Sequence, residues 1–260
     1  MNTSSPQRFN ALAGGYATSE VHTGSPTLDR LHQLLNNVDS VCDVASGAGH
    51  TGLGFAGIAS QIVAVDPAPN MLAQVKRLAA ERGVAVETVE AFAESIPLAS
   101  ASFDLVVCRL AAHHFSELSK AMTEMTRLAK PGGYVAIIDM EGDENPVLDA
   151  LNHEIEVLHD PTHIRSYTVK HWRELFVTNR LEVEVCENRC WEIPNGLTVK
   201  RWCELSDSGA EAFNAIEDRL ASASLNDLSG LEIIRDADGG FRLPIRTLLI
   251  VGRKPSESNK

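Results

Sequence analysis

A glycine-rich segment near residue 47 contains the first residues whose types and spacing point to chemistry. The segment VCDVASGAGHTG (41–52) joins an apolar run containing Asp43 to three glycines, Gly47, Gly49 and Gly52. A second apolar run ends in Asp66, seventeen residues after Gly49. A strand entering a glycine loop, then a helix, then a strand that ends in an acid is how an open α/β sheet builds a nucleoside pocket. The segment therefore predicts a nucleoside site, although its glycines also fit the G-x-G-x-x-G spacing of dinucleotide-binding loops.

Histidines and acids follow two later apolar runs. His113 and His114 come directly after one run, and Asp139 and Glu141 lie at the end of the next. Ligands of open parallel sheets bind at the carboxyl ends of the strands, so these residues are expected at one rim. A neutral imidazole there could accept a proton near neutral pH. Adjacent histidines point different ways, so we expect one in the site and one in a structural role. Asp139 and Glu141 fit a site role or a solvated loop acid or helix N-cap about equally.

The segment HDPTHIRSY (159–167) gathers further polar side chains, among them His163 and Arg165. Two histidines and an acid are residue types that can bind a metal ion, but their spacing does not match a recognised set of metal ligands. We therefore expect no metal here, and assign His163 and Arg165 to substrate contact or to the structure of a cap.

Strands alternate with amphipathic helices over the first 140 residues, which predicts parallel crossovers within one sheet. Further helices after Asp139 predict a partial cap, and a last strand is expected over 241–253. The expected strands are 38–45, 61–66, 84–89, 103–108, 134–139, 181–187 and 241–253. The expected helices are 9–16, 28–35, 51–59, 71–79, a helix between Ser116 and Pro131, 147–158, 168–177, 197–205 and 210–221.

Length, net charge and cysteine content limit the classes to which the protein can belong. The 260 residues suffice for one domain over 1–260. The net charge of −12 disfavours a nucleic-acid partner or an anionic membrane surface, because both need a basic face. Five scattered cysteines without a C-x-x-C pair predict free, largely buried thiols. No apolar signal core or spanning run is present, so a cytoplasmic protein is expected, and a homodimer is left open.

Several motifs occur in one order along the first 140 residues. They are VCDVASGAG, VAVDPAPNML, AESIPLASASFDLVV, LAKPGG and CRLAAHHF. Together they resemble class I S-adenosylmethionine-dependent methyltransferases, of the small-molecule type grouped with the ubiquinone and menaquinone C-methyltransferases. The resemblance implies a Rossmann-like, mostly parallel seven-stranded sheet with helices on both faces, an antiparallel last strand and a small helical cap. It divides the chain into a lid arm (1–26), a cofactor-binding core (27–140), a substrate-side cap with the sixth strand (141–240), and the last strand with its tail (241–260).

The resemblance also implies the cofactor, S-adenosylmethionine, and roles for single residues. Asp43 would help to hold the ligand's ammonium, often through water, and Asp66 would accept both ribose hydroxyls. Gly47 and Gly49 would let the backbone approach the ligand, because a Cβ would collide with it. Met71 offers a soft wall for adenine. The implied cofactor contacts are Asp43, Ala45, Gly47, Gly49, Asp66, Pro67, Met71, Phe92, Ala93 and Arg109.

Two residues depart from the family pattern. Ala45 replaces the first loop glycine, a mild change if its φ is negative. Phe92 replaces an acid that would accept the adenine amino proton, so adenine recognition must come from backbone groups, stacking or Glu94. Arg109 is expected to contact the cofactor by its backbone, with its side chain as an alternative surface ion-pair partner.

The catalytic assignment rests on His113 and His114, one of which should face the methyl acceptor. His163 or Tyr16 should close the opposite wall, with Asp139 and Arg165 also on the substrate side. Tyr16 and His22 are unusual in a solvated arm, so we expect residues 1–26 to form a lid that excludes water, with a disordered tail as the alternative.

Two other functions remain as alternatives: a nicotinamide or flavin oxidoreductase, and a non-catalytic ligand-binding protein that keeps the fold. The acceptor is expected to be a small organic molecule. Its identity, the atom methylated (carbon, oxygen or nitrogen) and the need for a base remain open.

Overall fold

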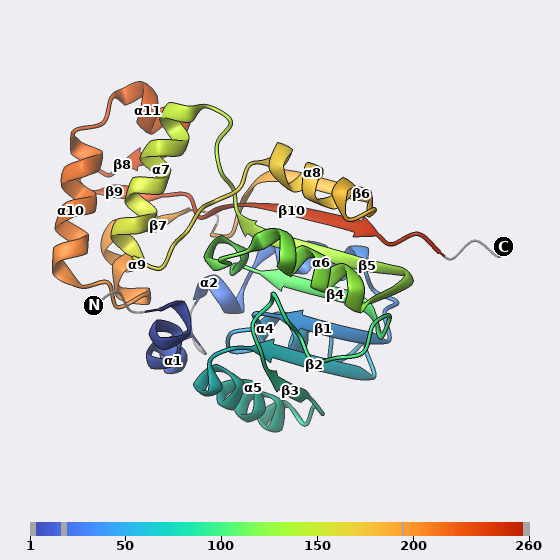
Figure 1. Ribbon diagram of the computed structural model, residues 1–260. Helices are drawn as coiled ribbons and strands as arrows, with labels where there is room; N and C mark the ends of the chain where they lie inside the picture. Colours follow the sequence, from blue (N-terminus) through green and yellow to red (C-terminus); the bar gives the residue numbers. More distant parts are fainter. Residues whose placement is uncertain (1–3, 17–19, 194, 257–260) are drawn as a thin grey trace.

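The computed structural model describes residues 4–16, 20–193 and 195–256. Its centre is a seven-stranded sheet in the order β3-β2-β1-β4-β5-β10-β6 (Figure 1). Strands β1 to β5 pair in parallel, and β10 runs antiparallel to both β5 and β6. This confirms the expected sheet and its antiparallel last strand. The strands are β1 (Ser40–Val44), β2 (Gln61–Asp66), β3 (Glu87–Glu90), β4 (Phe103–Arg109), β5 (Ala129–Met140), β6 (Glu182–Trp191) and β10 (Arg246–Arg253).

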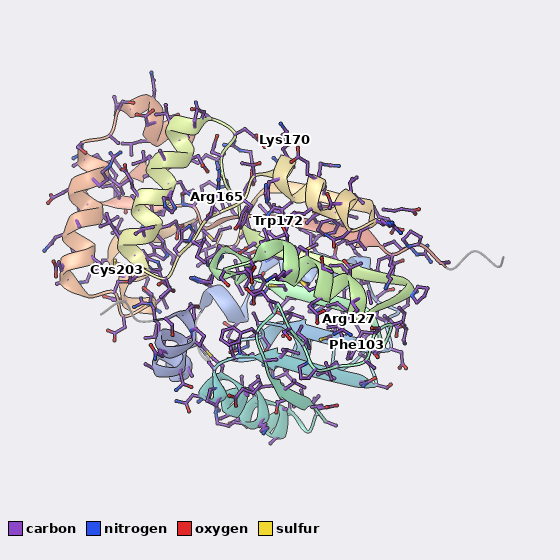
Figure 2. The ribbon with its side chains drawn as sticks, in the orientation of Figure 1. Phe103, Arg127, Arg165, Lys170, Trp172 and Cys203 are labelled. Carbon is purple, nitrogen blue, oxygen red and sulfur yellow. The ribbon has the colours of Figure 1, made fainter. Side chains whose placement is uncertain are left out.

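Alternate side chains of β1 enter two apolar layers, as the two-residue period of a strand requires. Val41 packs with Leu31 and Phe55 on one face of the sheet. Cys42 and Val44 pack on the other face, in the layer that holds Trp172 (Figure 2). Helices therefore cover both faces, as expected. They are α3 (Pro26–Leu34), α4 (His50–Gly54) and α5 (Pro69–Arg82) on one face, and α6 (Leu118–Leu128) and α8 (Val169–Thr178) on the other.

A second apolar core lies beside the carboxyl ends of the strands, in the cap. Here the prediction of one last strand over 241–253 is wrong. Pro244 interrupts it, because proline has no N–H to donate to a ladder. Phe241–Leu243 (β9) joins a separate three-stranded sheet, and only Arg246–Arg253 enters the main sheet. The remaining cap elements are α7 (Pro146–His159), β7 (Leu197–Thr198), α9 (Val199–Leu205), α10 (Gly209–Ala221), α11 (Leu225–Gly230) and β8 (Ile234–Arg235).

The N-terminal arm contains α1 (Ser5–Tyr16) and α2 (Glu20–Thr23). Figure 1 shows α1 between α5 and the cap. Asn10 of α1 accepts a hydrogen bond from Asn70 N at 2.8 Å and a second from Asn70 Nδ2, at its backbone oxygen, at 3.0 Å. Within the described ranges, no helix has the length and apolar character that crossing a membrane requires.

Candidate functional site

The glycine loop leaves β1 through three residues with left-handed backbone. Ala45, Gly47 and Gly49 have φ values of 53°, 52° and 86°. The expectation that alanine is harmless here depended on a negative φ at Ala45 and is therefore wrong. A left-handed residue that carries a Cβ costs roughly 1–2 kcal/mol, so the loop holds strain at this position.

Gly47 and Gly49 are glycines for different reasons. A Cβ on Gly47 would meet no protein atom within 4 Å, so the space beside it is open to a ligand. A Cβ on Gly49 would lie 2.9 Å from Val75 Cγ2 of α5, and Gly49 does not line the cavity described below. The expected role of Gly49 is thus corrected: it gives room to a helix rather than to a ligand.

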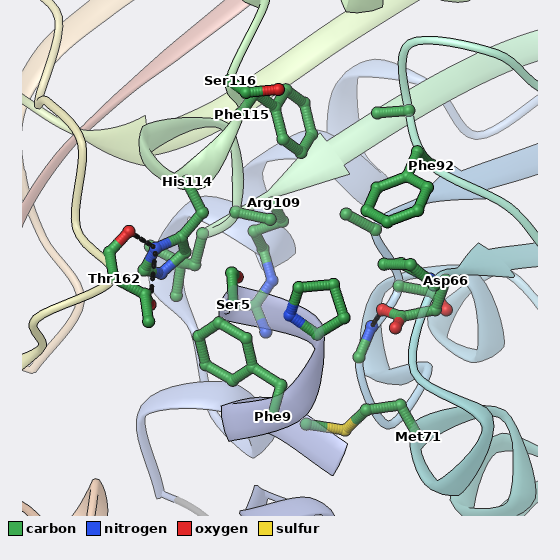
Figure 3. Close-up of a pocket in the computed structure, with 18 of the residues that line it drawn as sticks. Ser5, Phe9, Asp66, Met71, Phe92, Arg109, His114, Phe115, Ser116 and Thr162 are labelled. Atoms are coloured by element: carbon green, nitrogen blue, oxygen red, sulfur yellow. Dashed lines mark hydrogen bonds between the residues drawn. The ribbon is translucent and has the colours of Figure 1, made fainter. Parts of the chain in front are cut away.

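The loop opens onto a cavity of about 400 Å³ at the carboxyl ends of β1, β2 and β4. In Figure 3, Asp66, Met71 and Phe92 lie at one end of the cavity, and His114 and Thr162 lie at the other. Most of the expected cofactor residues line it, whereas Asp43 and Gly49 do not. Those that line it are Ala45, Gly47, Asp66, Pro67, Met71, Phe92, Ala93 and Arg109.

Asp66 ends β2 with both carboxylate oxygens already oriented. Oδ2 accepts a hydrogen bond from Gly47 N at 2.9 Å, and Oδ1 accepts one from Ala68 N at 2.8 Å. Burial raises the pKa of Asp66 to about 6, against the lowering effect of these two bonds. Each oxygen keeps a further lone pair, so the carboxylate can accept two neighbouring hydroxyls of a ligand.

Asp43 lies within β1, in the strand before the loop as the motif predicts, and does not line the cavity. Its side chain is buried, and its Oδ2 accepts a hydrogen bond from Gly52 N at 2.8 Å. Burial raises the pKa of Asp43 to about 7, although the Gly52 bond and the charge of Arg109 oppose this. Asp43 therefore anchors the start of α4 from behind the loop, and a direct contact with a ligand in the cavity is not available to it.

At the Asp66 end, Met71 is almost fully buried, whereas 59% of the Phe92 surface is exposed. Both side chains line the cavity together with Ala93 and Glu94. Glu94 Oε1 accepts a hydrogen bond from Ser116 Oγ at 3.1 Å, which joins this end to the segment after the histidines. A planar ring between Met71 and Phe92 would meet apolar surface on both sides.

Arg109, the last residue of β4, has its side chain in the cavity. Figure 3 shows the Arg109 side chain between the two ends of the cavity. The guanidinium is buried, and Nε donates to Thr51 Oγ1 at 3.1 Å. Burial lowers the pKa of Arg109, and the carboxylates of Glu192 and Asp43 counter that effect. The alternative of a surface ion pair is therefore wrong, and the side chain places positive charge against the loop.

The two histidines are placed by a turn at the end of β4. Leu110 has a φ of 52°, an uncommon left-handed conformation for leucine, and the 3-10 helix η1 (Ala112–His114) follows at once. His113 Nδ1 lies 2.6 Å from Asp139 Oδ1 at the end of β5. His114 Nδ1 donates to the Thr162 carbonyl at 3.0 Å (Figure 3). The adjacent histidines thus have separate partners, and both of them line a cavity, His114 the one described above and His113 a smaller one described below.

The surroundings of the two histidines also shift their pKa values in opposite directions. Burial opposes charge on His113, but the charge and hydrogen bond of Asp139 outweigh burial and raise the pKa of His113. Burial and the neighbouring His113 lower the pKa of His114 to about 3, so His114 is neutral at physiological pH. Asp139 is 1% exposed, which rules out a solvated loop acid. His113 with Asp139 has the arrangement of a proton acceptor and its orienting carboxylate.

A second cavity, of about 100 Å³, adjoins the first. Both cavities are lined by Phe9, Leu110 and His114. The smaller cavity also exposes His163, which sequence reasoning placed on the substrate side, and Glu156, which it missed. The signal for Glu156 was available, because an acid there interrupts the apolar face of the predicted helix. Its remaining lining residues are Val21, His113, Met140, His159, Asp160, Trp202, Leu205, Ser206 and Ile245.

Helix α1 covers the first cavity. Ser5 and Phe9 line it, and the Phe9 ring meets the His114 ring edge-on at 4.9 Å (Figure 3). Arg8 Nε lies 3.1 Å from Asp160 Oδ1, an ion pair that joins α1 to the cap. These contributions from α1 were not predicted. The predictions for the side chains of Tyr16 and His22 lie outside the described residues.

Arg165 is the expected substrate-side residue that the structure places elsewhere. Its guanidinium lies near the surface, 3.6 Å from Asp149, and lines neither cavity (Figure 2). The backbone N–H of Arg165 contacts the histidine segment instead, because it donates a hydrogen bond to the His113 carbonyl at 3.2 Å. In the part of the chain that the structure describes, no group of His, Cys, Asp or Glu is arranged to hold a metal ion.

Similar proteins agree with this geometry. A methyltransferase domain model matches residues 42–137. The uncharacterised methyltransferase YcgJ of Bacillus subtilis is 33% identical over 185 residues, which cover 71% of this chain and 72% of YcgJ. A demethylmenaquinone methyltransferase of Chlorobaculum parvum is 34% identical over 112 residues, which cover 43% of this chain and 45% of that protein.

Solved structures extend the likeness through the cap. The crystal structure of YcgJ matches with a TM-score of 0.79 at 29% identity, over 88% of this chain and 98% of that chain. A putative methyltransferase of Bacillus halodurans matches with a TM-score of 0.81 at 25% identity, over 88% of this chain and 99% of that one. The chain therefore belongs to the class I S-adenosylmethionine-dependent methyltransferases.

Proposed function

We propose that the larger cavity binds S-adenosylmethionine and that the protein transfers its methyl group to a small organic acceptor. One observation carries the proposal. A single cavity presents the oriented carboxylate of Asp66 at one end and His114 at the other, with the open space beside Gly47 between them. A nucleoside that carries a reactive group on its 5′ side would span these two ends.

Each part of the ligand has a chemical partner in the lining. The two oxygens of Asp66 accept the ribose hydroxyls, and Met71 and Phe92 flank the adenine. The guanidinium of Arg109 is suited to the carboxylate of the methionyl part, because planar guanidinium groups bind carboxylates in paired hydrogen bonds. A contact from Asp43 to the ligand's ammonium would require an intervening water.

When bound, S-adenosylmethionine supplies a methyl group already activated by its sulfonium. The protein's own contribution is then orientation and exclusion of water. Helix α1 serves the second purpose, because Ser5 and Phe9 stand over the cavity and Arg8 ties the helix to Asp160. The acceptor is expected beside Phe9, Leu110 and His114, the residues that line both cavities.

Calorimetric titration tests the cofactor assignment. The purified protein should bind S-adenosylmethionine and S-adenosylhomocysteine in the micromolar range and should not bind NAD. Gly47→Val should abolish binding, because the added side chain fills the open space and strains a backbone with a φ of 52°. Asp66→Ala should weaken binding by roughly 1–3 kcal/mol through loss of charge-assisted hydrogen bonds.

The matched control is Asp39→Ala, an exposed acid at the opposite end of β1. It should bind both ligands as the unaltered protein does. Equal affinity in Gly47→Val, Asp66→Ala and Asp39→Ala would contradict the proposed cofactor position, and tight NAD binding would favour an oxidoreductase.

A further inference from the structure

The smaller cavity is built to receive a ligand of its own. Its volume of about 100 Å³ compares with the roughly 150 Å³ of an engineered cavity that accepts benzene, so one small ring or an equally compact group fits. One wall is Trp202, whose indole stacks on His159 with ring centroids 3.7 Å apart. The shared residues Phe9, Leu110 and His114 place this space next to the larger cavity.

His163, one of the residues that line this space, carries a buried polar atom without a partner in the described part of the chain. His163 is 6% exposed, and its Nε2 has no hydrogen-bond partner among the described residues. Its ring stacks on His113 at a centroid distance of 5.4 Å. Burial and the surrounding histidines lower the pKa of His163 to about 2, so it is a neutral donor or acceptor. A buried polar atom without a partner is costly unless a bound molecule satisfies it.

Two further groups in the cavity can handle a proton. His113 bonds Asp139 through Nδ1, which leaves Nε2 as the basic nitrogen. Glu156 is 7% exposed, and burial raises its pKa to about 7, with the charge of His113 opposing. Its carboxyl is therefore largely protonated below neutral pH and can donate a hydrogen bond.

We infer that the smaller cavity is the acceptor subsite and takes a compact, uncharged molecule with a weakly acidic hydroxyl, a phenol or an enol. This inference rests on the proposed function. His113, oriented by Asp139, removes the hydroxyl proton, and Glu156 and His163 bind a second polar group or the oxygen itself.

The charges around the acceptor favour a hydroxyl acceptor over an amine acceptor. Deprotonation of a hydroxyl creates an oxyanion between two cations, the imidazolium of His113 and the cofactor's sulfonium, and both stabilise it. Deprotonation of an ammonium leaves a neutral amine, which gains little from either cation. Asp139 is paired with His113 and Asp160 with Arg8, so little uncompensated negative charge remains to hold an ammonium.

The step balances in atoms and charge. The acceptor O–H bond breaks, and its proton moves to His113 Nε2. The oxygen, or the carbon conjugated with it, then bonds to the methyl carbon. The C–S bond breaks, its electron pair stays on sulfur, and the products are a neutral thioether, a methylated acceptor and an imidazolium that later releases its proton to water.

Label transfer from methyl-labelled S-adenosylmethionine tests the acceptor class. The probes are phenol, the enol of acetylacetone, and aniline and butylamine as the nitrogen acceptors. Transfer to phenol or to the enol should exceed transfer to either amine by roughly 10-fold or more. Transfer that is greater for an amine, or absent for all four probes while S-adenosylhomocysteine binds, overturns the inference and leaves the proposed cofactor site intact. Failure to bind S-adenosylhomocysteine overturns both.

The pH profile tests the two proton-handling groups. The value of kcat/KM should rise with pH as His113 loses its proton and fall at higher pH as Glu156 ionises, which gives a bell shape. Asp139 is bonded to His113 behind the cavity wall. The other groups that face this pair are Asp160, His114, His159 and His163 in the cavity, and Glu141 and Arg246 on the other side of Glu156.

Single substitutions test which residue gives each limb of the pH profile. His113→Ala should lower kcat by roughly 100-fold, and Asp139→Asn should shift the rising limb to lower pH. Glu156→Gln keeps a donor that cannot ionise, so it should lose the falling limb while kcat/KM drops by roughly 3- to 10-fold. Glu154→Gln, an exposed residue of the same helix, is the matched control. A falling limb that persists in Glu156→Gln, or normal turnover in His113→Ala, would overturn the inference.

Discussion

Binding of the cofactor's nucleoside part should depend on pH through Asp66, and Asp66→Asn should remove that dependence. The ionised carboxylate accepts from Gly47 N and Ala68 N and is free to accept two ribose hydroxyls as well. A protonated carboxyl would have to place its own hydrogen against one of these donors. The ligand should therefore bind the ionised form in preference.

The magnitude follows from the pKa of about 6 that burial gives Asp66. One pH unit below that value, about a tenth of the molecules carry the ionised carboxylate, so the apparent affinity should be about 10-fold weaker, or roughly 1.4 kcal/mol. At pH 7.5 the ionised form predominates. There Asp66→Asn should weaken binding by roughly 1–3 kcal/mol, because an amide NH₂ would face a backbone donor.

The assay is calorimetry between pH 5 and pH 7.5 with methylthioadenosine, which has the ribose hydroxyls but no titrating amino acid. Asp43 has a pKa of about 7 and titrates in the same range, so Asp43→Asn is measured in parallel. Asp43→Asn should retain the roughly 10-fold loss of affinity at low pH. A loss of the same size in Asp66→Asn would refute the assignment of this pH dependence to Asp66.

Three further changes have expected outcomes. Ala45→Gly should raise the free energy of unfolding by about 0.5–1 kcal/mol, because relief of the left-handed strain at this position exceeds the entropy cost of a glycine. Urea denaturation with an unchanged m-value would measure this change. Gly49→Ala should lower it by about 2–4 kcal/mol in the same assay, because the new Cβ meets Val75 and the φ is left-handed; a stability equal to that of the unaltered protein would contradict this packing. Hydrogen exchange across residues 1–26 should slow when cofactor and acceptor bind, and Arg8→Ala should speed exchange in α1 by removing its ion pair with Asp160; equal exchange in all these states would favour a tail over a lid.

The periodicity of the sequence was sufficient to predict most of the main sheet. Strand β2 has the predicted bounds, Gln61–Asp66, because a continuous apolar run between polar residues has one reading in a buried parallel sheet. Helix α5 ends at Arg82 and is followed by Gly83, whose φ of 67° is the left-handed cap that a glycine after an apolar stripe predicts. The local pattern was not sufficient where one apolar run contributes strands to two different sheets, because only long-range strand pairing distinguishes them. The strand predicted over 241–253 is divided between two sheets, and proline alone did not reveal the second sheet.

The sequence by itself also determined which residue types reach the rim, because an acid or histidine after a buried strand must lie at its carboxyl end. Only the tertiary structure decided what each one does there. Nothing local distinguishes His113 from His114; the parallel pairing of β4 with β5 brings Asp139 to the first, and the cap brings the Thr162 carbonyl to the second. Glu156 can handle a proton near neutral pH because the folded chain removes it from water, and the free energy of desolvation depends on neighbours distant in the chain, such as Met140, Trp202 and Ile245.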